Sequence, residues 1–475
     1  MCFDLIQNAI YSPRLSLGNT PQNEKQATNR TRDHTINRCS AIDFCMTIYR
    51  KVKDALGSRI YLLGLRVYEL RKTAKENAMY LFGIKVRSKR PKRLVDEAVE
   101  QKIRELVQRN KDLPESERLI LCFDCLYDPL AEAIDAWTLF EYLQEQGIPS
   151  RYALLRTNPL YKQLQQENRL KDILPVDTEA DLLIQYPDII ASCKRIFFSF
   201  PFTCSRILYE LPTCPFIFIE HGVSFLKPWS MELYTDGGTS ECNYILTPTQ
   251  LTSKLYTALH LMQGRTLNAG MPRWDKLPPI DHSKQQRNIF IFFTWRVTFM
   301  QDKKHMATYI ERIADFVSRV EALVSKSPNI RVHVGLHHAL MQHCGVQDFS
   351  QFENVAFVPP TDISGMIRDT DLFITDYSSV CFDLMYRDVP TIFYRFDSDL
   401  TYSNNMDNEA ARSAAEKASE LYNCYYTIED TLHKIEHYIN TGFRIEEPIR
   451  RRNNEIFWQR SHNCRRLLEL TNAII

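Results

Sequence analysis

The feature that most constrains the fold is a repeated alternation of short apolar runs with segments of helical period. The first series contains the apolar runs LILCFDC, SRYALL, KRIFFSF, CPFIFIEHG and YILTP. A second series follows with NIFIFFTW, IRVHVGLH, VAFVP, DLFIT and TIFYRF, and the proline-rich segment MPRWDKLPPIDHS separates the two. Apolar runs that alternate with helices are typical of parallel sheets covered by helices on both faces.

The two series predict an α/β protein with two Rossmann-like, doubly wound domains that face each other across a cleft. We expect residues 1–40 to be poorly ordered, 41–100 to form a basic helical extension, 101–275 and 286–440 to form the two domains, and 441–475 to form a C-terminal helix. In open α/β sheets, ligands bind beyond the carboxyl ends of the strands. The side chains that follow the strands are therefore the candidates for function.

The segment 45–93 differs from the rest in charge, with 14 Lys and Arg against three acidic residues. Ile60, Leu63, Val67 and Leu70 recur there at helical spacing. A basic amphipathic helix is attracted to an anionic membrane surface by about 1 kcal/mol per nearby basic residue. The alternative is a helix packed on the main body with a solvated basic face. The net charge of the whole chain, +1, argues against a nucleic-acid partner.

Glycine is scarce, with 14 residues in 475, and neither G-x-G-x-x-G nor G-K-[ST] occurs. A phosphate site must therefore use another element. In DLFITDYSSVCFDL an apolar strand turns through Asp376 and Tyr377 into a helix opened by Ser378 and Ser379. Serine is a favoured N-cap, and a helix N-terminus attracts anions, so this segment predicts a pyrophosphate site without glycine. The alternative is an ordinary capped helix.

Histidines end two of the expected strands. His221 closes CPFIFIE and is followed by Gly222, and His337 and His338 close IRVHVGL. A histidine at a strand end can act as a general base because its ordinary pKa is near neutrality, although a structural role is the common alternative. A metal site built on these histidines is not expected, because no carboxylate is interleaved with them and H-E-x-x-H is absent. The thirteen scattered cysteines indicate reduced thiols in a cytosolic protein.

Several segments together resemble the CDP-glycerol:polyglycerophosphate glycerophosphotransferases, the teichoic-acid polymerase family. FITDYSSVCFDLMYRDVPTIFYRFDSD is similar to the C-terminal signature of that family, and FIEHGVSFLKPW to its W-H-G-T-P-L-K motif. AGMPRWDKL is similar to its G-x-P-R-x-D segment and FFTWR to its P-T-W-R. The matches span roughly residues 215–400 in the order and spacing of the family.

The resemblance implies a GT-B-like fold and a transferase that moves a polyol phosphate from a CDP-polyol to a hydroxyl of a growing lipid-linked polymer, releasing CMP. CDP-glycerol or CDP-ribitol would be a substrate, and no cofactor is implied. His221 would be the base, and His337 or its neighbour His338 would contact the transferred phosphoryl group. The implied donor-binding residues are Ser378, Ser379, Asp376, Thr294, Arg296 and Arg273, and the acceptor-binding residues are Lys227 and Gly222.

Departures from the family pattern leave alternatives open. Val223 and Ser224 replace the Thr-Pro of the first motif, and the usual R-G-x-Y and P-G-P stretches are missing downstream. The product could therefore be a wall polymer of glycerol or ribitol phosphate, or a capsular polymer. The competing functions are a GT-B glycosyltransferase with a nucleotide-sugar donor and a non-catalytic nucleotide-binding protein. We expect a cytoplasmic protein, peripheral on the inner face of the cell membrane through the basic segment.

Overall fold

The chain divides into two compact units. One comprises Met1–Arg71 and Ala78–Ser88, and the other comprises Lys72–Asn77 and Lys89–Ile475. The computed structural model describes residues 49–54, 57–62, 65–72, 77–81, 84–89, 95–211, 214–226, 234–235, 238, 240–294, 303–337, 340, 354–397 and 423–474. The expectation of a poorly ordered segment at 1–40 lies outside the described residues.

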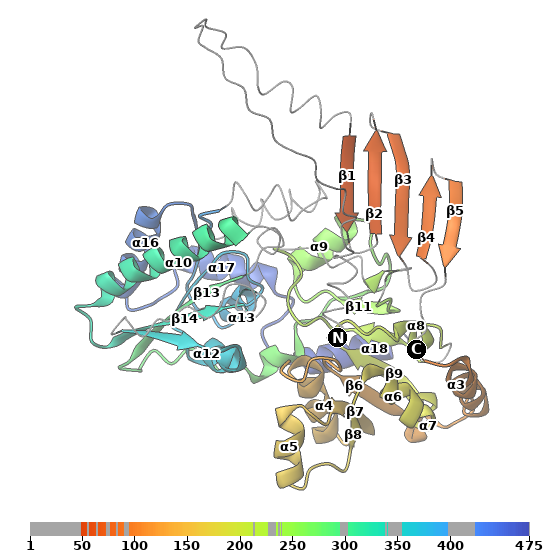
Figure 1. Cartoon of the computed structure of the whole chain (residues 1–475). Helices are drawn as coiled ribbons and strands as arrows, with labels where there is room; N and C mark the ends of the chain where they lie inside the picture. Colours follow the sequence, from red (N-terminus) through yellow and green to blue (C-terminus); the bar gives the residue numbers. More distant parts are fainter. Residues whose placement is uncertain are drawn as a thin grey trace, which may run out of the picture. The chain divides into compact units, whose positions relative to one another are not determined.

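The described residues of the first unit form a five-stranded sheet in the order β1-β2-β3-β4-β5, in which β1 pairs with β2 and β2 with β3 in antiparallel fashion (Figure 1). Its strands are β1 (Tyr49–Asp54), β2 (Gly57–Leu62), β3 (Leu65–Lys72), β4 (Asn77–Leu81) and β5 (Ile84–Lys89). The predicted helical extension is therefore wrong for this segment. Only two residues separate β1 from β2, β2 from β3 and β4 from β5, and connections of that length join hairpin strands.

The second unit contains two sheets, and the first has seven strands in the order β12-β11-β10-β9-β6-β7-β8, with neighbours parallel. Its strands are β6 (Leu119–Phe123), β7 (Ser150–Leu155), β8 (Ile173–Val176), β9 (Cys193–Phe198), β10 (Phe216–Phe218), β11 (Tyr244–Leu246) and β12 (Thr266–Leu267). The central strands are buried on both faces, which explains their continuous apolar sequences.

The other sheet has six parallel strands in the order β15-β14-β13-β16-β17-β18. They are β13 (Arg287–Phe293), β14 (Ile330–Leu336), β15 (Val355–Val358), β16 (Leu372–Thr375), β17 (Thr391–Tyr394) and β18 (Asn423–Tyr425). The prediction of two doubly wound α/β domains is confirmed by these two sheets and the helices between their strands.

Helices follow the strands of both sheets, as the sequence pattern predicts (Figure 1). Those of the first domain are α3 (Glu97–Arg109), α4 (Asp135–Glu145), α5 (Pro159–Gln166), α6 (Glu179–Gln185), α7 (Pro187–Ala191), α8 (Ser205–Tyr209) and α9 (Gln250–Ala258). Those of the second are α10 (Lys303–Val324), α12 (Ile363–Asp369), α13 (Cys381–Tyr386) and α16 (Ile428–Asn440). Among the described helices, none is both long enough and apolar enough to span a membrane.

Alternate residues of β13 enter different buried clusters. Ile289 and Ile291 pack with residues of α10 and α16, whereas Phe290 and Phe292 belong to the cluster that fills the first domain. Apolar packing is thus continuous between the two domains of this unit. The short helix η3 (Pro272–Lys276) in the proline-rich segment joins the same cluster through Trp274.

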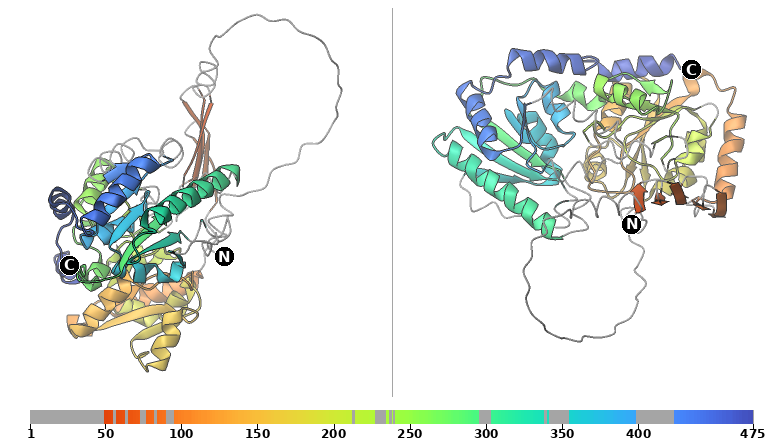
Figure 2. Two further views of the ribbon diagram at one scale, coloured as in Figure 1. Left: turned by 90° about the vertical axis from the view of Figure 1, so that its left-hand side faces the viewer. Right: turned by 90° about the horizontal axis from the view of Figure 1, so that it is seen from above.

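The C-terminal segment forms two helices, α17 (Glu447–Ile456) and α18 (Asn463–Asn472), instead of one. Figure 2 shows them in blue along one side of the unit. The first domain is contacted both by α18 and by the segment that joins α17 to α18. The indole Nε1 of Trp458 donates to the carbonyl oxygen of Thr247 at 2.7 Å, and Leu467 is buried in the first domain's cluster. The C-terminal segment therefore packs on the first α/β domain.

Candidate active site

Three predicted site residues follow neighbouring strands at the carboxyl edge of the second sheet. Thr294 follows β13, His337 follows β14 and Asp376 follows β16. The backbone N–H of His337 donates to the carbonyl of Phe293 at 3.2 Å, and the N–H of Thr294 donates to Asp376 Oδ1 at 3.1 Å. The structure thus brings these positions together, as the strand-end rule predicts.

Asp376 is fully buried and accepts hydrogen bonds from its surroundings. Its oxygens receive the N–H groups of Thr294 and Tyr377 and, at 3.0 Å, the hydroxyl of Tyr309 from α10. Thr294 is buried as well. These bonds hold the ends of two adjacent strands and a covering helix together. A contact of Asp376 or Thr294 with a donor stays a prediction.

Ser378 and Ser379 lie in the turn between β16 and α13. The sequence predicts that the two serines open the helix, but they precede it. The helix begins at Cys381. The hydroxyl of Ser378, which is buried, accepts the N–H of Val380 at 3.3 Å, while Ser379 is half-buried. The N-cap of α13 is Val380, with no side-chain cap, so the prediction of a serine N-cap is wrong. Ser378 is instead bonded within the turn, and Ser379 is the more accessible hydroxyl of the pair.

His221 and Gly222 reach this turn from the first domain. They follow β10 after Glu220, whose φ of 63° is in the left-handed region. A Cβ added to Gly222 would lie 2.8 Å from the Oγ of Ser379. Only glycine permits this close approach without a shift of the neighbouring serine. The structure therefore places the histidine of one domain next to the serine turn of the other.

The imidazole of His221 is held on two sides and exposed on another. Its Nδ1 lies 3.1 Å from the carbonyl oxygen of Ser199, and its ring stacks on Phe200 with centroids 4.6 Å apart. Because a carbonyl only accepts, Nδ1 carries the proton and Nε2 keeps a lone pair. Desolvation by the surrounding protein lowers the pKa of His221, and the positive charge of Arg273 acts in the same direction. Neutral His221 can therefore accept a proton through Nε2.

Arg273 forms a buried ion-pair cluster between the domains. Its Nε and Nη2 donate to both carboxylate oxygens of Asp383 in α13, at 2.8 and 3.1 Å, and its Nη1 donates to Asp135 at the start of α4, at 2.5 Å. The indole of Trp274 also donates to Asp383, at 2.6 Å. The guanidinium is thus committed to carboxylates. Because Nε, Nη1 and Nη2 all donate to carboxylates, the guanidinium has no nitrogen left unpaired for the predicted binding of the donor phosphates.

Other predicted residues lie elsewhere. Lys227, Arg296 and His338 are outside the described residues, so their roles stay predictions. The segment Asp369–Asp371 lies before β16, at the opposite end of that strand from the serine turn.

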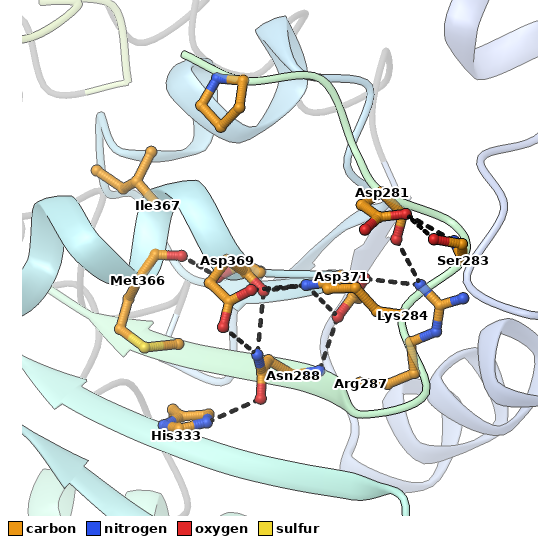
Figure 3. A network of polar contacts seen from close by, with 12 residues as sticks. Asp281, Ser283, Lys284, Arg287, Asn288, His333, Met366, Ile367, Asp369 and Asp371 are labelled. Carbon is orange, nitrogen blue, oxygen red and sulfur yellow. Dashed lines mark hydrogen bonds and ion pairs between the residues drawn. The ribbon is translucent and has the colours of Figure 1, made fainter. Parts of the chain in front are cut away.

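Asp371 is fully buried and receives Arg287 at 3.0 Å and the N–H of Asn288 at 2.8 Å. The side chain of Asn288 in turn contacts Asp369 at 2.6 Å and His333 at 3.1 Å (Figure 3). The buried carboxylate of Asp371 thus pairs with the guanidinium of Arg287 and accepts the backbone N–H of Asn288. Within the described part of the chain, no three His, Cys, Asp or Glu residues are grouped to hold a metal ion.

Two residues near His221 are not predicted by the sequence reasoning. Ser199 follows β9, and Asp124 follows β6 and accepts the hydroxyl of Ser199. One sequence feature could have indicated this pair: Asp124 ends the apolar run in LILCFDC, so it is expected at the same sheet edge as His221. The pairing itself depends on strand order, which the sequence does not state.

Comparison with known proteins shows which family the chain belongs to. The family model described as CDP-Glycerol:Poly(glycerophosphate) glycerophosphotransferase matches residues 180–423, more than half of the chain. The minor teichoic acid biosynthesis protein GgaB of Bacillus subtilis is 23% identical over 309 residues, 62% of this chain and 33% of that protein. A teichoic acid glycerol-phosphate transferase of Staphylococcus aureus is 25% identical over 225 residues, 40% of this chain and 55% of that protein.

The chain thus spans a third of the first relative and about half of the second. A solved structure of the wall teichoic acid polymerase TagF is 15% identical, with a TM-score of 0.48 over 80% of this chain and 97% of that one. The matched region includes His221, Arg273, His337 and the serine turn. The chain belongs to the CDP-glycerol:poly(glycerophosphate) glycerophosphotransferase family.

Proposed function

We propose that this protein transfers a polyol phosphate, glycerol phosphate first, from a CDP-polyol to a hydroxyl of a growing lipid-linked surface polymer, with release of CMP. The observation that carries the proposal is the contact between Gly222 and Ser379. It supports the proposal because Gly222 follows His221 directly, and Ser379 belongs to the turn that the family resemblance assigns to the donor pyrophosphate. The polymer is a teichoic acid or a capsular polymer of the same chemistry.

The proposed reaction is a direct displacement at phosphorus. Nε2 of His221 takes the proton of the acceptor hydroxyl, and the acceptor oxygen attacks the phosphorus that carries the polyol. A new phosphodiester bond forms while the bond from that phosphorus to the bridging oxygen breaks, and CMP leaves with the electron pair. His337, half-buried at the carboxyl edge, is assigned to the charge that develops on the phosphoryl oxygens or the leaving CMP.

The test is CMP release from CDP-glycerol and CDP-ribitol by purified protein with a lipid-linked primer. We expect turnover with one of them, and His221→Ala lowers it on the order of 100-fold or more because the base is lost. His333→Ala is the matched control, since that histidine lies in the polar network of Asp369 and Asp371. Turnover of a nucleotide-sugar with no CMP release from either CDP-polyol would instead support a glycosyltransferase. Unchanged turnover in His221→Ala would point to a non-catalytic role.

We further propose that the N-terminal sheet binds an anionic membrane surface on the cytoplasmic side. In the register of β1–β3, Arg50, Arg59, Arg66 and Arg71 occupy positions of one sheet face, together with the two acidic residues Asp54 and Glu69. Lysines and arginines near an anionic surface contribute about 1 kcal/mol each. Replacing the four arginines with glutamine in the full chain should move the protein from phosphatidylglycerol vesicles to the supernatant in sedimentation. Equal sedimentation of the variant and the parent protein would refute this attachment.

A further inference from the structure

Asp124 is a buried carboxylate, and each of its two oxygens accepts two hydrogen bonds. Oδ1 accepts the N–H of Ala136 at 3.1 Å and the hydroxyl of Ser199. Oδ2 accepts the N–H of Trp137 at 3.0 Å and the hydroxyl of Tyr152 at 2.7 Å. Its side chain therefore has one orientation, fixed from α4, β7 and the end of β9.

Ser199 links this carboxylate to His221. It is fully buried, its hydroxyl donates to Asp124, and its carbonyl oxygen accepts the Nδ1–H of His221 at 3.1 Å. Phe200 stacks on the same imidazole with an interplanar angle of 23°. Two successive residues after β9 thus hold the ring, one through its edge and one through its face.

The other imidazole nitrogen, Nε2, can accept a proton. Among the described residues, none makes a hydrogen bond to Nε2 of His221, and the residue is exposed. The charged and titratable groups around it are Arg273 of η3, the neighbouring Glu220 and, behind Ser199, Asp124. The group that holds Nδ1 is a neutral carbonyl, so an imidazolium at this position gains less stabilisation than it would from a carboxylate.

We propose that Asp124 and Ser199 act as a positioning pair, which fixes the plane and the tautomer of His221 so that Nε2 is the proton-accepting nitrogen. The inference rests on the proposed function, because His221 is the base only if the protein is a transferase. Asp124 and Ser199 do not touch the reacting atoms. They act through the carbonyl of Ser199, whose direction is set when its hydroxyl is bonded to the fixed carboxylate.

The test compares Ser199→Ala with Ser199→Thr in the full chain. Alanine removes the bond to Asp124 but keeps the carbonyl, whereas threonine restores a hydroxyl. We expect Ser199→Ala to lower kcat on the order of 10- to 100-fold with KM for CDP-glycerol nearly unchanged, and Ser199→Thr to recover most of it. Ser240→Ala is the matched control, because Ser240 is a buried serine of the same domain that accepts the N–H of Phe202 at 3.0 Å.

A second readout does not depend on transfer. Nitrogen NMR of labelled histidine should show His221 protonated at Nδ1 in the parent protein and a mixture of tautomers in Ser199→Ala. The positioning role is overturned if the parent carries its proton on Nε2, or if Ser199→Ala and Ser240→Ala have equal kcat and the tautomer is unchanged. If no CDP-polyol is turned over by the parent protein, the proposed function fails, while the NMR result still decides the positioning of His221.

Discussion

Removal of Asp383 provides the sharpest test of the structure, because it separates a structural role of Arg273 from donor binding. Asp383 is 2% exposed at its side chain and takes two donors from Arg273 and one from Trp274. Asp383→Ala leaves the guanidinium with Asp135 alone and leaves the indole N–H without its acceptor. Both losses occur inside the protein, where solvent cannot replace the bonds.

The expected magnitude follows from burial. Breaking a buried ion pair by removing one partner costs about 3–5 kcal/mol of unfolding free energy. An orphaned buried donor such as the Trp274 indole costs about 1–3 kcal/mol. Since these losses share one carboxylate and are not additive, Asp383→Ala should lower the unfolding free energy by about 4 kcal/mol. Asp315→Ala is the matched control, because its ion pair with Arg319 is half-exposed and is worth less than about 1 kcal/mol.

Arg273→Met breaks the same ion-pair cluster from the other side, and its effect on the unfolding free energy should depend on pH. Desolvation raises the pKa of Asp135 to about 7, and the charge of Arg273 opposes that rise. Without the arginine, the folded state holds the proton of Asp135 still more strongly than the unfolded state does. Stability is then lost as pH rises from about 4 through 7 and beyond, so the cost of Arg273→Met should be larger at pH 8 than at pH 5.5.

The assay is denaturant unfolding followed by tryptophan fluorescence, for both single variants and the double variant. A coupling free energy above about 1 kcal/mol in this cycle is expected for residues in direct contact. Costs below 1 kcal/mol for both single variants would refute the cluster. A raised KM for CDP-glycerol in Arg273→Met, with unchanged unfolding, would favour the donor-binding role instead.

Two further predictions concern buried positions. Gly270→Ala should lower the unfolding free energy by about 1–3 kcal/mol in the same assay, because its Cβ would lie 2.1 Å from the Oδ1 of buried Asn463. Gly365→Ala, with nothing within 4 Å of its Cβ, should not, and equal effects would contradict the packing argument. Burial raises the pKa of Glu220 to about 8, so the folded state holds its proton and this group's contribution to stability falls as pH rises from about 4.5 to 8. Glu220→Gln should therefore gain about 1–4 kcal/mol relative to the parent between pH 5.5 and 8.5, and parallel stability curves would contradict it.

The two α/β domains could be predicted because strands buried on both faces have continuous apolar sequences, whatever their partners are. The N-terminal sheet could not be distinguished from a helix by spacing alone. Ile60, Leu63, Val67 and Leu70 satisfy a helical period, yet Ile60 lies in β2, whereas Val67 and Leu70 lie in its antiparallel neighbour β3. The stronger signal was the glycine in the two-residue segments Leu63–Gly64 and Phe82–Gly83, which is typical of hairpin connections.

The site was predictable where it depends on strand ends and unpredictable where it depends on pairing across the chain. His337 and Asp376 follow β14 and β16, the two parallel strands that flank β13, so the rule for open sheets was sufficient to place both at the same sheet edge. The ion pairs of Arg273 join η3 to α4 and α13, and no local pattern states which carboxylates an arginine meets. An arginine in a motif is therefore weak evidence for ligand binding until its partners are known.

The helix α13 connects the stability of the domain contact to the proposed chemistry. This helix is only six residues long, and its residue Asp383 is bonded to Arg273. The turn that leads into it contains Ser379, which lies next to Gly222. A shift of this helix would change the distance between the serine turn and His221, which belong to different domains. Asp383→Ala should therefore reduce turnover even under conditions where the protein remains folded. A folded Asp383→Ala protein with parental kcat would show that the serine turn is positioned by other contacts, and that the cluster serves stability alone.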